Sequence, residues 1–136
     1  MKQAGYSGTP LLSKLGVKEG SRLALIKAPA GFAEWLPALP SGASLRQRGA
    51  GEADVIVLFV KARSDLETIG FAMRWMPAEG GMLWVAWPKK ASGIVIDLSE
   101  DFVRGAGLAI GLVDTKVCAI DGTWSGLRFS RRKTKA

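Results

Sequence analysis

Two unbroken apolar runs, at residues 55–60 and 82–87, dominate the hydrophobic pattern of the chain. Six apolar residues in a row, without alternation, indicate a parallel strand that is covered on both faces. Between the two runs, apolar residues recur at helical spacing from Leu66 to Met76, which is typical of an amphipathic helix. We therefore predict a strand–helix–strand unit over residues 54–90, with both strands at the centre of a sheet.

Weaker periodic segments precede this unit. Residues 9–16 predict a short helix, because they begin with Thr-Pro and end with Gly, residue types that suit an N-cap, a first helical position and a left-handed stop. A strand is predicted over 22–27 and a second short helix over 31–36. The weak strand predicted over 43–48 contains two arginines, which suits the edge of a sheet because charge discourages further pairing.

The last third of the chain predicts a helix and a hairpin. The helix over 99–111 begins with a Ser cap followed by two acidic residues, which favours the helix dipole, and it ends at a Gly. The Asp-Gly pair at 121–122 separates apolar runs over 114–120 and 123–129, a pattern typical of a hairpin. Gly126 interrupts the final strand, where we expect a bulge.

These elements together predict an α/β fold. We expect an open, mostly parallel, Rossmann-like sheet of about six strands, with helices on both faces and a C-terminal antiparallel hairpin. This order of elements resembles that of class I methyltransferases, which also end on an antiparallel strand. Residues 1–129 are expected to form a single domain, followed by a basic tail over 130–136.

The composition excludes several kinds of catalytic and metal site. The 136 residues include no His and one Cys, so Ser-His-Asp and Cys-His catalysis, zinc sites with His or several Cys, and intrachain disulfides are all excluded. Cys118 lies in an apolar run, and we expect it to be buried and inert. The acidic residues do not cluster, and no metal site is predicted.

The charge and hydropathy of the chain bear on its location and partners. The net charge is +7, and every charged residue from Arg128 onward is basic. Nucleic-acid binding through basic surfaces is therefore one alternative function. No apolar run approaches the roughly 18 residues that span a bilayer, and the N-terminus lacks the apolar core of a secretory signal. We therefore expect a cytoplasmic protein that does not bind membranes.

A basic edge is the strongest candidate for a ligand site. In open parallel sheets, ligands bind beyond the carboxyl ends of the strands, and in this chain those ends run into basic residues. Such residues can bind a phosphate or a carboxylate, with help from a hydroxyl and from backbone N–H groups. The candidate ligand-binding residues are Lys27, Lys61, Arg63, Lys89, Lys90 and Ser92.

A Rossmann-type cofactor site is not predicted. Such a site uses a glycine-rich turn after the first strand, so that the backbone can approach the ligand, and an acidic residue that holds a ribose. The turn over 28–32 has one Gly and a Pro, and Arg46 and Arg48 stand where the acidic residue is expected. We therefore predict no cofactor.

The remaining aromatic and acidic residues have structural interpretations. Trp75, Trp84 and Trp87 lie in predicted buried elements and are expected in the core, whereas Trp35 and Trp124 are expected to be more exposed. Three scattered aspartates near element ends are expected to cap helices or form turns rather than act in catalysis. These aspartates are Asp97, Asp114 and Asp121.

Three motifs resemble a family of small bacterial proteins classed only as a domain of unknown function. They are YxGTPLxxKLG from Tyr6, GMLWVAWPK from Gly81 and DxKVxAIDxTWSGLRF from Asp114. The resemblance implies a stand-alone, cytoplasmic bacterial domain, and it supplies no activity. Positions that match the family's recurring polar residues are Lys89, Asp114, Lys116, Asp121, Trp124 and Ser125.

These observations support several functional hypotheses. The first is a non-catalytic binding or regulatory module that recognises an anionic ligand or a protein partner, favoured by the missing His and the altered glycine loop. The alternative is an enzyme, a degenerate transferase that uses Lys or Asp chemistry at the carboxyl edge of the sheet. The second alternative is nucleic-acid binding through the basic surfaces.

Overall fold

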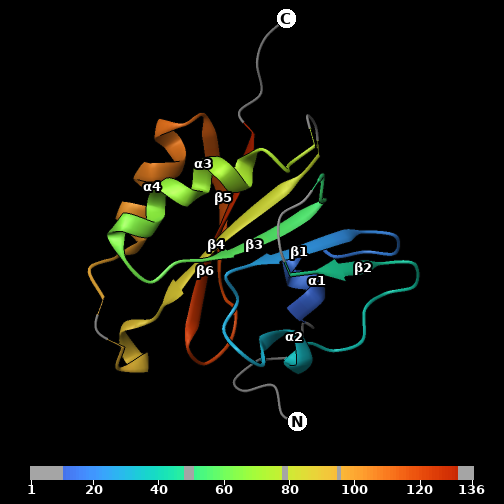
Figure 1. The fold of residues 1–136 in the computed structure, drawn as a ribbon. Coiled ribbons are helices and arrows are strands. Elements are labelled where there is room, and N and C mark those ends of the chain that lie inside the picture. The colour runs from blue at the N-terminus through green and yellow to red at the C-terminus, as the bar shows by residue number, and fades with distance from the viewer. Residues whose placement is uncertain (1–10, 48–50, 78–79, 95, 132–136) are drawn as a thin grey trace, which may run out of the picture.

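The computed structural model describes residues 11–47, 51–77, 80–94 and 96–131 (Figure 1). The predicted N-cap Thr9, the predicted first helical residue Pro10, and residues 132–136 of the predicted tail lie outside the described residues. The elements, in chain order, are α1 (Leu11–Leu15), β1 (Arg22–Ile26), α2 (Phe32–Trp35), β2 (Ser44–Arg46), β3 (Val55–Phe59), η1 (Arg63–Glu67), α3 (Thr68–Met73), β4 (Met82–Pro88), η2 (Lys90–Ser92), α4 (Glu100–Ala109), β5 (Leu112–Ala119) and β6 (Trp124–Arg131).

The six strands form one sheet in the order β2-β1-β3-β4-β6-β5. β2, β1, β3 and β4 are parallel, and β6 is antiparallel to both of its neighbours, β4 and β5. β5 therefore runs in the same direction as the parallel strands, and the tip of the β5–β6 hairpin lies at their carboxyl ends. The predicted open, mostly parallel sheet with a C-terminal antiparallel hairpin is confirmed.

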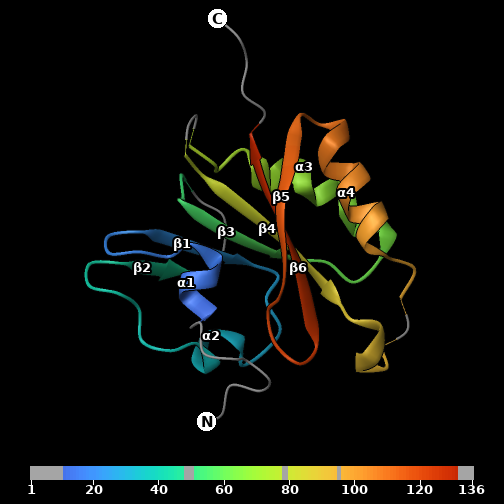
Figure 2. The same ribbon diagram turned by 180° about the vertical axis from the view of Figure 1, so that it is seen from behind.

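Two hydrophobic clusters lie on opposite faces of the sheet, because successive side chains of a strand point to opposite sides. α1 and α2 cover one face, where Leu15 and Phe32 pack on alternate residues of β1, β3 and β4. α3 and α4 cover the other face with Ile69 and Val103 (Figures 1 and 2). All five residues of β3 are buried, as its unbroken apolar run predicts.

Helix α1 is joined to the centre of the sheet through its last turn. The indole N–H of Trp84 donates a hydrogen bond of 3.0 Å to the carbonyl oxygen of Leu15, one of the carbonyls that a helix end leaves without a partner. Gly16 then adopts a left-handed conformation, with φ 93°, and ends the helix as predicted.

The segment after β3 begins as a 3₁₀ turn, whereas the sequence predicts one continuous helix. Asp65 explains this start, because its carboxylate accepts hydrogen bonds from the backbone N–H groups of Lys61 and Ala62. The backbone therefore turns tightly before it becomes α-helical at Thr68.

Helix α4 begins where the sequence predicts. The hydroxyl of Ser99 accepts a hydrogen bond from the backbone N–H of Phe102. On the sheet side, Gly107 lies directly against the ring of Phe129 in β6, and a Cβ atom at this position would overlap the ring. Glycine at 107 therefore sets how closely α4 approaches the sheet.

The hairpin differs from the prediction in two ways. The irregularity in register lies between Asp114 and Lys116 in β5, and not at Gly126. Gly126 instead leaves room for neighbouring side chains, since a Cβ there would lie 2.8 Å from Ile120 and 3.1 Å from Trp84. β6 also extends to Arg131, two residues past the predicted end of the strand, because Ser130 and Arg131 pair with Val113 and Leu112 of β5. The Arg131 guanidinium donates to carbonyl oxygens of residues 73, 76 and 77.

Candidate functional site

Three of the predicted site residues stand where neighbouring parallel strands end. Lys27 follows β1, Lys61 lies two residues beyond β3, and Lys89 follows β4. Because β1, β3 and β4 are adjacent in the sheet, these three lysines belong to the same edge. Lys27 and Lys61 are exposed and Lys89 is half-buried.

The other predicted site residues have structural contacts of their own. The backbone N–H of Arg63 donates to the Asp97 carboxylate at 2.7 Å, and its guanidinium lies 4.0 Å from the centre of the Phe102 ring in α4. Ser92 donates to the carbonyl oxygen of Lys89 and accepts from the N–H of Ile94, so its hydroxyl shapes the turn after β4. Lys90 is exposed at the start of the same turn. Ligand binding by these residues stays a prediction.

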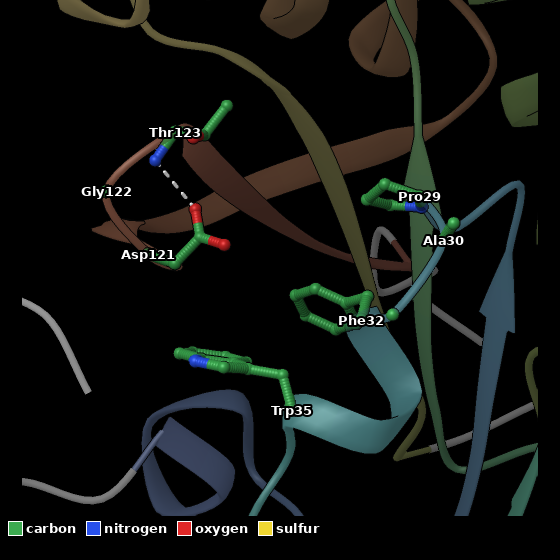
Figure 3. A pocket seen from close by; sticks show the side chains of 8 residues that line it. Pro29, Ala30, Phe32, Trp35, Asp121, Gly122 and Thr123 are labelled. Carbon is green, nitrogen blue, oxygen red and sulfur yellow. Dashed lines mark hydrogen bonds between the residues drawn. The ribbon is translucent and has the colours of Figure 1, made fainter. Parts of the chain in front are cut away.

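A pocket of about 320 Å³ lies at the same edge, on the face that α1 and α2 cover. It is bounded on one side by the β1–α2 loop and α2, and on the other by the tip of the β5–β6 hairpin (Figure 3). Its walls are formed by Pro29, Ala30, Gly31, Phe32, Trp35, Asp121, Gly122 and Thr123. Two segments about 90 residues apart in the sequence therefore meet at this pocket.

Asp121 supplies the carboxylate of the pocket and also shapes the hairpin. Its Oδ1 accepts hydrogen bonds of 2.8 Å from the backbone N–H groups of Thr123 and Trp124. The turn role predicted for Asp121 is thus present. Within the described part of the chain no donor reaches Oδ2, and Figure 3 shows this second oxygen on the side of the pocket interior. A carboxylate with a free oxygen can accept a hydrogen bond or a proton from a bound molecule.

The aromatic wall of the pocket continues into the core. The ring of Phe32 lies 5.6 Å from that of Trp35 and makes an edge contact of 4.9 Å with Phe59. Phe59 in turn meets Trp124 edge to face at 5.0 Å. Phe32, Phe59 and Trp124 are buried, whereas Trp35 is partly exposed and faces the pocket. Trp35 is therefore the open aromatic surface of the site.

Several predictions about single residues are corrected here. Trp124 is only 4% exposed, because the hairpin folds it onto Phe59, although the sequence suggests a freer position. Cys118 is half-buried rather than fully buried, and partial burial raises the pKa of its thiol, which lowers the fraction present as the nucleophilic thiolate. Asp114 does not cap a helix but pairs with Arg104 at 2.9 Å.

The comparisons with known proteins support the fold. The structure resembles ribosomal protein L11 methylase from Lactobacillus delbrueckii subsp. bulgaricus, with a TM-score of 0.59 and 15% identity over 90% of this chain and 75% of that one. It also resembles the fibrillarin pre-rRNA processing protein of Methanococcus jannaschii (TM-score 0.60, 14% identity, 96% and 72% coverage). A SAM-dependent methyltransferase from Aquifex aeolicus gives a TM-score of 0.55 and 12% identity, with 88% and 86% coverage.

The fold is thus the Rossmann-like fold of methyltransferases, and the predicted likeness in element order is confirmed. No protein-family model and no curated protein matches the sequence significantly. The resemblance to an uncharacterised bacterial family stays a prediction. Within the described ranges, no helix is long and apolar enough to cross a membrane.

The comparisons also correct the first functional hypothesis. A non-catalytic binding or regulatory module was expected, mainly because His and a glycine-rich loop are missing. The solved structures that share the fold include enzymes named as methylases or methyltransferases. This finding contradicts the hypothesis of a non-catalytic module.

The residues at the usual cofactor position do not fit a nucleoside-type methyl donor. Such a ligand is expected at the switch point of the sheet, here between β1 and β3, where the bulky, buried ring of Phe32 packs on Phe59. No carboxylate ends β2. Its last residue is Arg46, which donates to the carbonyl oxygens of Gly51 and Glu52. The pocket at this edge lies between the β1–α2 loop and the tip of the hairpin.

The sequence predicts the basic edge of the sheet but gives no sign of the pocket. The six predicted residues come from the ends of single strands, which the hydrophobic pattern reveals. Trp35 and Asp121 lie far apart in the sequence and on irregular segments, and no spacing connects them. The one available signal is the direction of β5, since a hairpin that follows a parallel strand has its tip at the carboxyl edge.

Proposed function

We propose that the chain is an enzyme of the transferase class that acts in the pocket between the β1–α2 loop and the hairpin tip. The observation that carries the proposal is the free Oδ2 of Asp121 in the pocket that the partly exposed Trp35 also lines, at the edge where proteins of this architecture bind ligands. The enzymes that share the fold support the reaction class.

In this proposal the aromatic residues of the pocket bind the substrate, and its carboxylate accepts a proton. Trp35 and Phe32 hold the apolar part of the substrate. Asp121 accepts a hydrogen bond from the O–H or N–H group of the acceptor substrate. When that oxygen or nitrogen attacks the transferable group of a second, activated donor substrate, the bond from that group to the donor breaks, the donor leaves with the bonding electrons, and Asp121 takes up the proton. The hydrogen bonds to Oδ1 hold the carboxylate in one orientation, so that little rearrangement is needed during the reaction.

The lysines at the same edge complete the proposed site. Lys27, Lys61 and Lys89 follow three adjacent strands. Positive charge at the mouth of a pocket attracts an anionic substrate and speeds its arrival. We assign these lysines to the anionic part of the substrate, outside the aromatic wall.

The test compares metabolite extracts treated with wild-type protein and with Asp121→Asn. The asparagine keeps an oxygen for the two backbone N–H groups but cannot accept a proton. We expect mass spectrometry to show a substrate consumed and a product that carries the transferred group, with the rate at least 100-fold lower in the variant. Glu34→Gln removes the same charge from an exposed position on α2 and should behave as wild type. Identical profiles for wild-type protein and a protein-free blank would refute the proposal.

A further inference from the structure

Three basic side chains lie near one another on the face of the sheet that α1 covers. In the strand register, Arg128 of β6 is paired with Trp84 of β4 on one side and with Lys116 of β5 on the other. Because directly paired residues share a face of a sheet, Arg128 and Lys116 lie on the same side as Trp84. The indole N–H of Trp84 reaches the carbonyl oxygen of Leu15 in α1, and Lys14 directly precedes Leu15. We call Lys14, Lys116 and Arg128 the basic cluster.

The side chain of Cys118 gives an independent sign that the three charges are close together. Cys118 follows Lys116 by two positions in β5 and packs with the hydrophobic cluster of the same face. Burial raises the pKa of its thiol, and the positive charges of Lys14, Lys116 and Arg128 partly oppose this rise. Each of the three charges therefore lies within electrostatic reach of one sulfur atom. Within the described residues, no carboxylate is among the charges that act on it.

The basic cluster lacks counter-ions. Within the described residues, none of its three cations forms an ion pair with a carboxylate, although Arg22 and Arg104 do. Lys116 and Arg128 are also direct cross-strand partners, an arrangement that destabilises a sheet because like charges repel. A bound anion would offset this repulsion.

Neutral groups hold the guanidinium of Arg128 in place. Its Nε donates at 2.8 Å to the hydroxyl of Thr115, which donates at 3.3 Å to the carbonyl oxygen of Arg128. Its Nη1 lies 3.8 Å from the sulfur of Met82, and its central carbon lies 6.0 Å from the centre of a Trp84 ring. Within the described residues, Nη2 has no partner. The guanidinium is therefore oriented without being neutralised, which lowers the entropy lost when it binds a ligand.

The chemistry of the basic cluster suits a chain of phosphates. Arginine and lysine are the usual phosphate-binding side chains, and here they come from three different elements, with Lys116 exposed and the other two half-buried. A nucleic-acid backbone supplies successive phosphates, and its binding is favoured by the release of counterions. A flexible single strand can adapt to cations on separate elements, whereas a duplex resists bending. The net charge of +7 adds a long-range attraction for such a polyanion.

We infer that the basic cluster is a docking surface for the phosphate backbone of a single-stranded nucleic acid. Arg128 binds one phosphate with its oriented guanidinium, and Lys14 and Lys116 bind the neighbouring ones. β5 continues from Lys116 toward the hairpin tip that lines the pocket, so the bound strand lies on the same face as the pocket. The inference does not depend on the proposed function, because binding is measured without any reaction.

The test measures the affinity of the full chain for a fluorescein-labelled oligouridylate, by fluorescence anisotropy at several salt concentrations. Lys14→Ala, Lys116→Ala and Arg128→Gln each remove one cation of the basic cluster. We expect each variant to bind about threefold more weakly or worse, and its plot of log affinity against log salt concentration to be shallower by about 0.7. Lys116 is exposed, so its replacement tests the inference without disturbing the core.

Arg74→Ala is the matched control for the loss of one charge. Arg74 is exposed and directly follows α3, which covers the opposite face of the sheet. This variant should bind the oligouridylate as the wild-type protein does. No binding by the wild-type protein, or the same loss in the control as in the three cluster variants, would overturn the inference.

Two further probes distinguish a single strand from other polyanions. A duplex of the same length, and vesicles that contain phosphatidylserine, should both bind more weakly than the oligouridylate. Tighter binding of either probe would overturn the assignment of the partner.

Chemical acetylation of lysines, mapped by mass spectrometry, tests the location of the bound strand. Lys116 should react more slowly when the oligouridylate is bound. Lys90, which is exposed in the turn after β4, should react at an unchanged rate. Equal protection of both lysines, or protection of neither, would contradict docking at the basic cluster.

Discussion

The hydrogen bond from Trp84 to Leu15 shows how one side chain positions an element far away in the sequence. Trp84 is fully buried in β4, and its indole N–H reaches a helix-end carbonyl 69 positions earlier. At the pocket, Asp121 has a similar double role, since Oδ1 shapes the hairpin and Oδ2 is left for a ligand. The indole N–H of Trp84 thus positions α1, and Oδ2 of Asp121 is the atom proposed to contact the ligand.

Replacing Trp84 tests the first of these roles. Trp84→Phe removes the donor and leaves the Leu15 carbonyl buried without a partner. We expect a loss of about 1–3 kcal/mol in the free energy of unfolding for the hydrogen bond alone, measured by urea denaturation. Trp87→Phe is the matched control, because the indole N–H of Trp87 makes no hydrogen bond within the described residues. Equal losses in the two variants would show that ring size, and not the hydrogen bond, matters.

At the scale of elements, close approach and aromatic packing determine where the helices lie. α4 reaches the sheet through Gly107, which contacts the ring of Phe129. α2 is held by Phe32, whose ring meets Phe59 edge to face. The first contact sets the packing of one face of the sheet, and the second places α2 beside the pocket that Phe32 and Trp35 line.

Two glycines in the same helix test the packing of α4. Gly107→Ala places a methyl group against Phe129, and we expect the strain of overpacking to lower the free energy of unfolding by about 1–3 kcal/mol. Gly105→Ala points into open space and should raise it by up to about 1 kcal/mol, since alanine is the better helix former. Thermal unfolding of both variants measures the contrast. A stabilised Gly107→Ala protein would contradict the close packing.

At the scale of the whole molecule, two ion pairs tie distant segments together. Asp54 accepts from the backbone N–H and the guanidinium of Arg22, and so joins the starts of β1 and β3. Arg104 in α4 pairs with Asp114 in β5 and with Glu100. The arginines lower the pKa of both aspartates below their ordinary value near 3.8, chiefly through side-chain hydrogen bonds.

These lowered pKa values predict how stability depends on pH. A carboxyl group whose pKa is lower in the folded protein stabilises it fully above the unfolded value, and this contribution is lost as the pH falls through the folded value. We therefore expect the free energy of unfolding to decrease as the pH falls below about 4. Asp54→Asn and Asp114→Asn should each lessen this decrease, measured by denaturant titration at several pH values. Glu34→Gln should leave it unchanged, and an equal decrease in all variants would contradict the assignment.

The elements of the fold follow closely from the sequence, and the candidate site follows only in part. The apolar runs of β3 and β4 define buried strands without any tertiary information, and Ser99 and Gly16 mark helix ends through local hydrogen bonding and backbone geometry. The basic edge follows from the residues after each strand. The burial of Trp124 does not, because it depends on a contact with Phe59, which lies 65 positions earlier.

By itself, the sequence determined the order of strands and helices, the strands covered on both faces, and the absence of histidine chemistry. Those properties depend on hydrophobic periodicity, local caps and composition. The tertiary structure alone decided that the β1–α2 loop meets the tip of the hairpin, that Phe32 packs on Phe59, and that Asp121 and Trp35 line one pocket. These contacts join segments far apart in the chain, and they form only when the whole sheet brings the carboxyl ends of its strands to one edge.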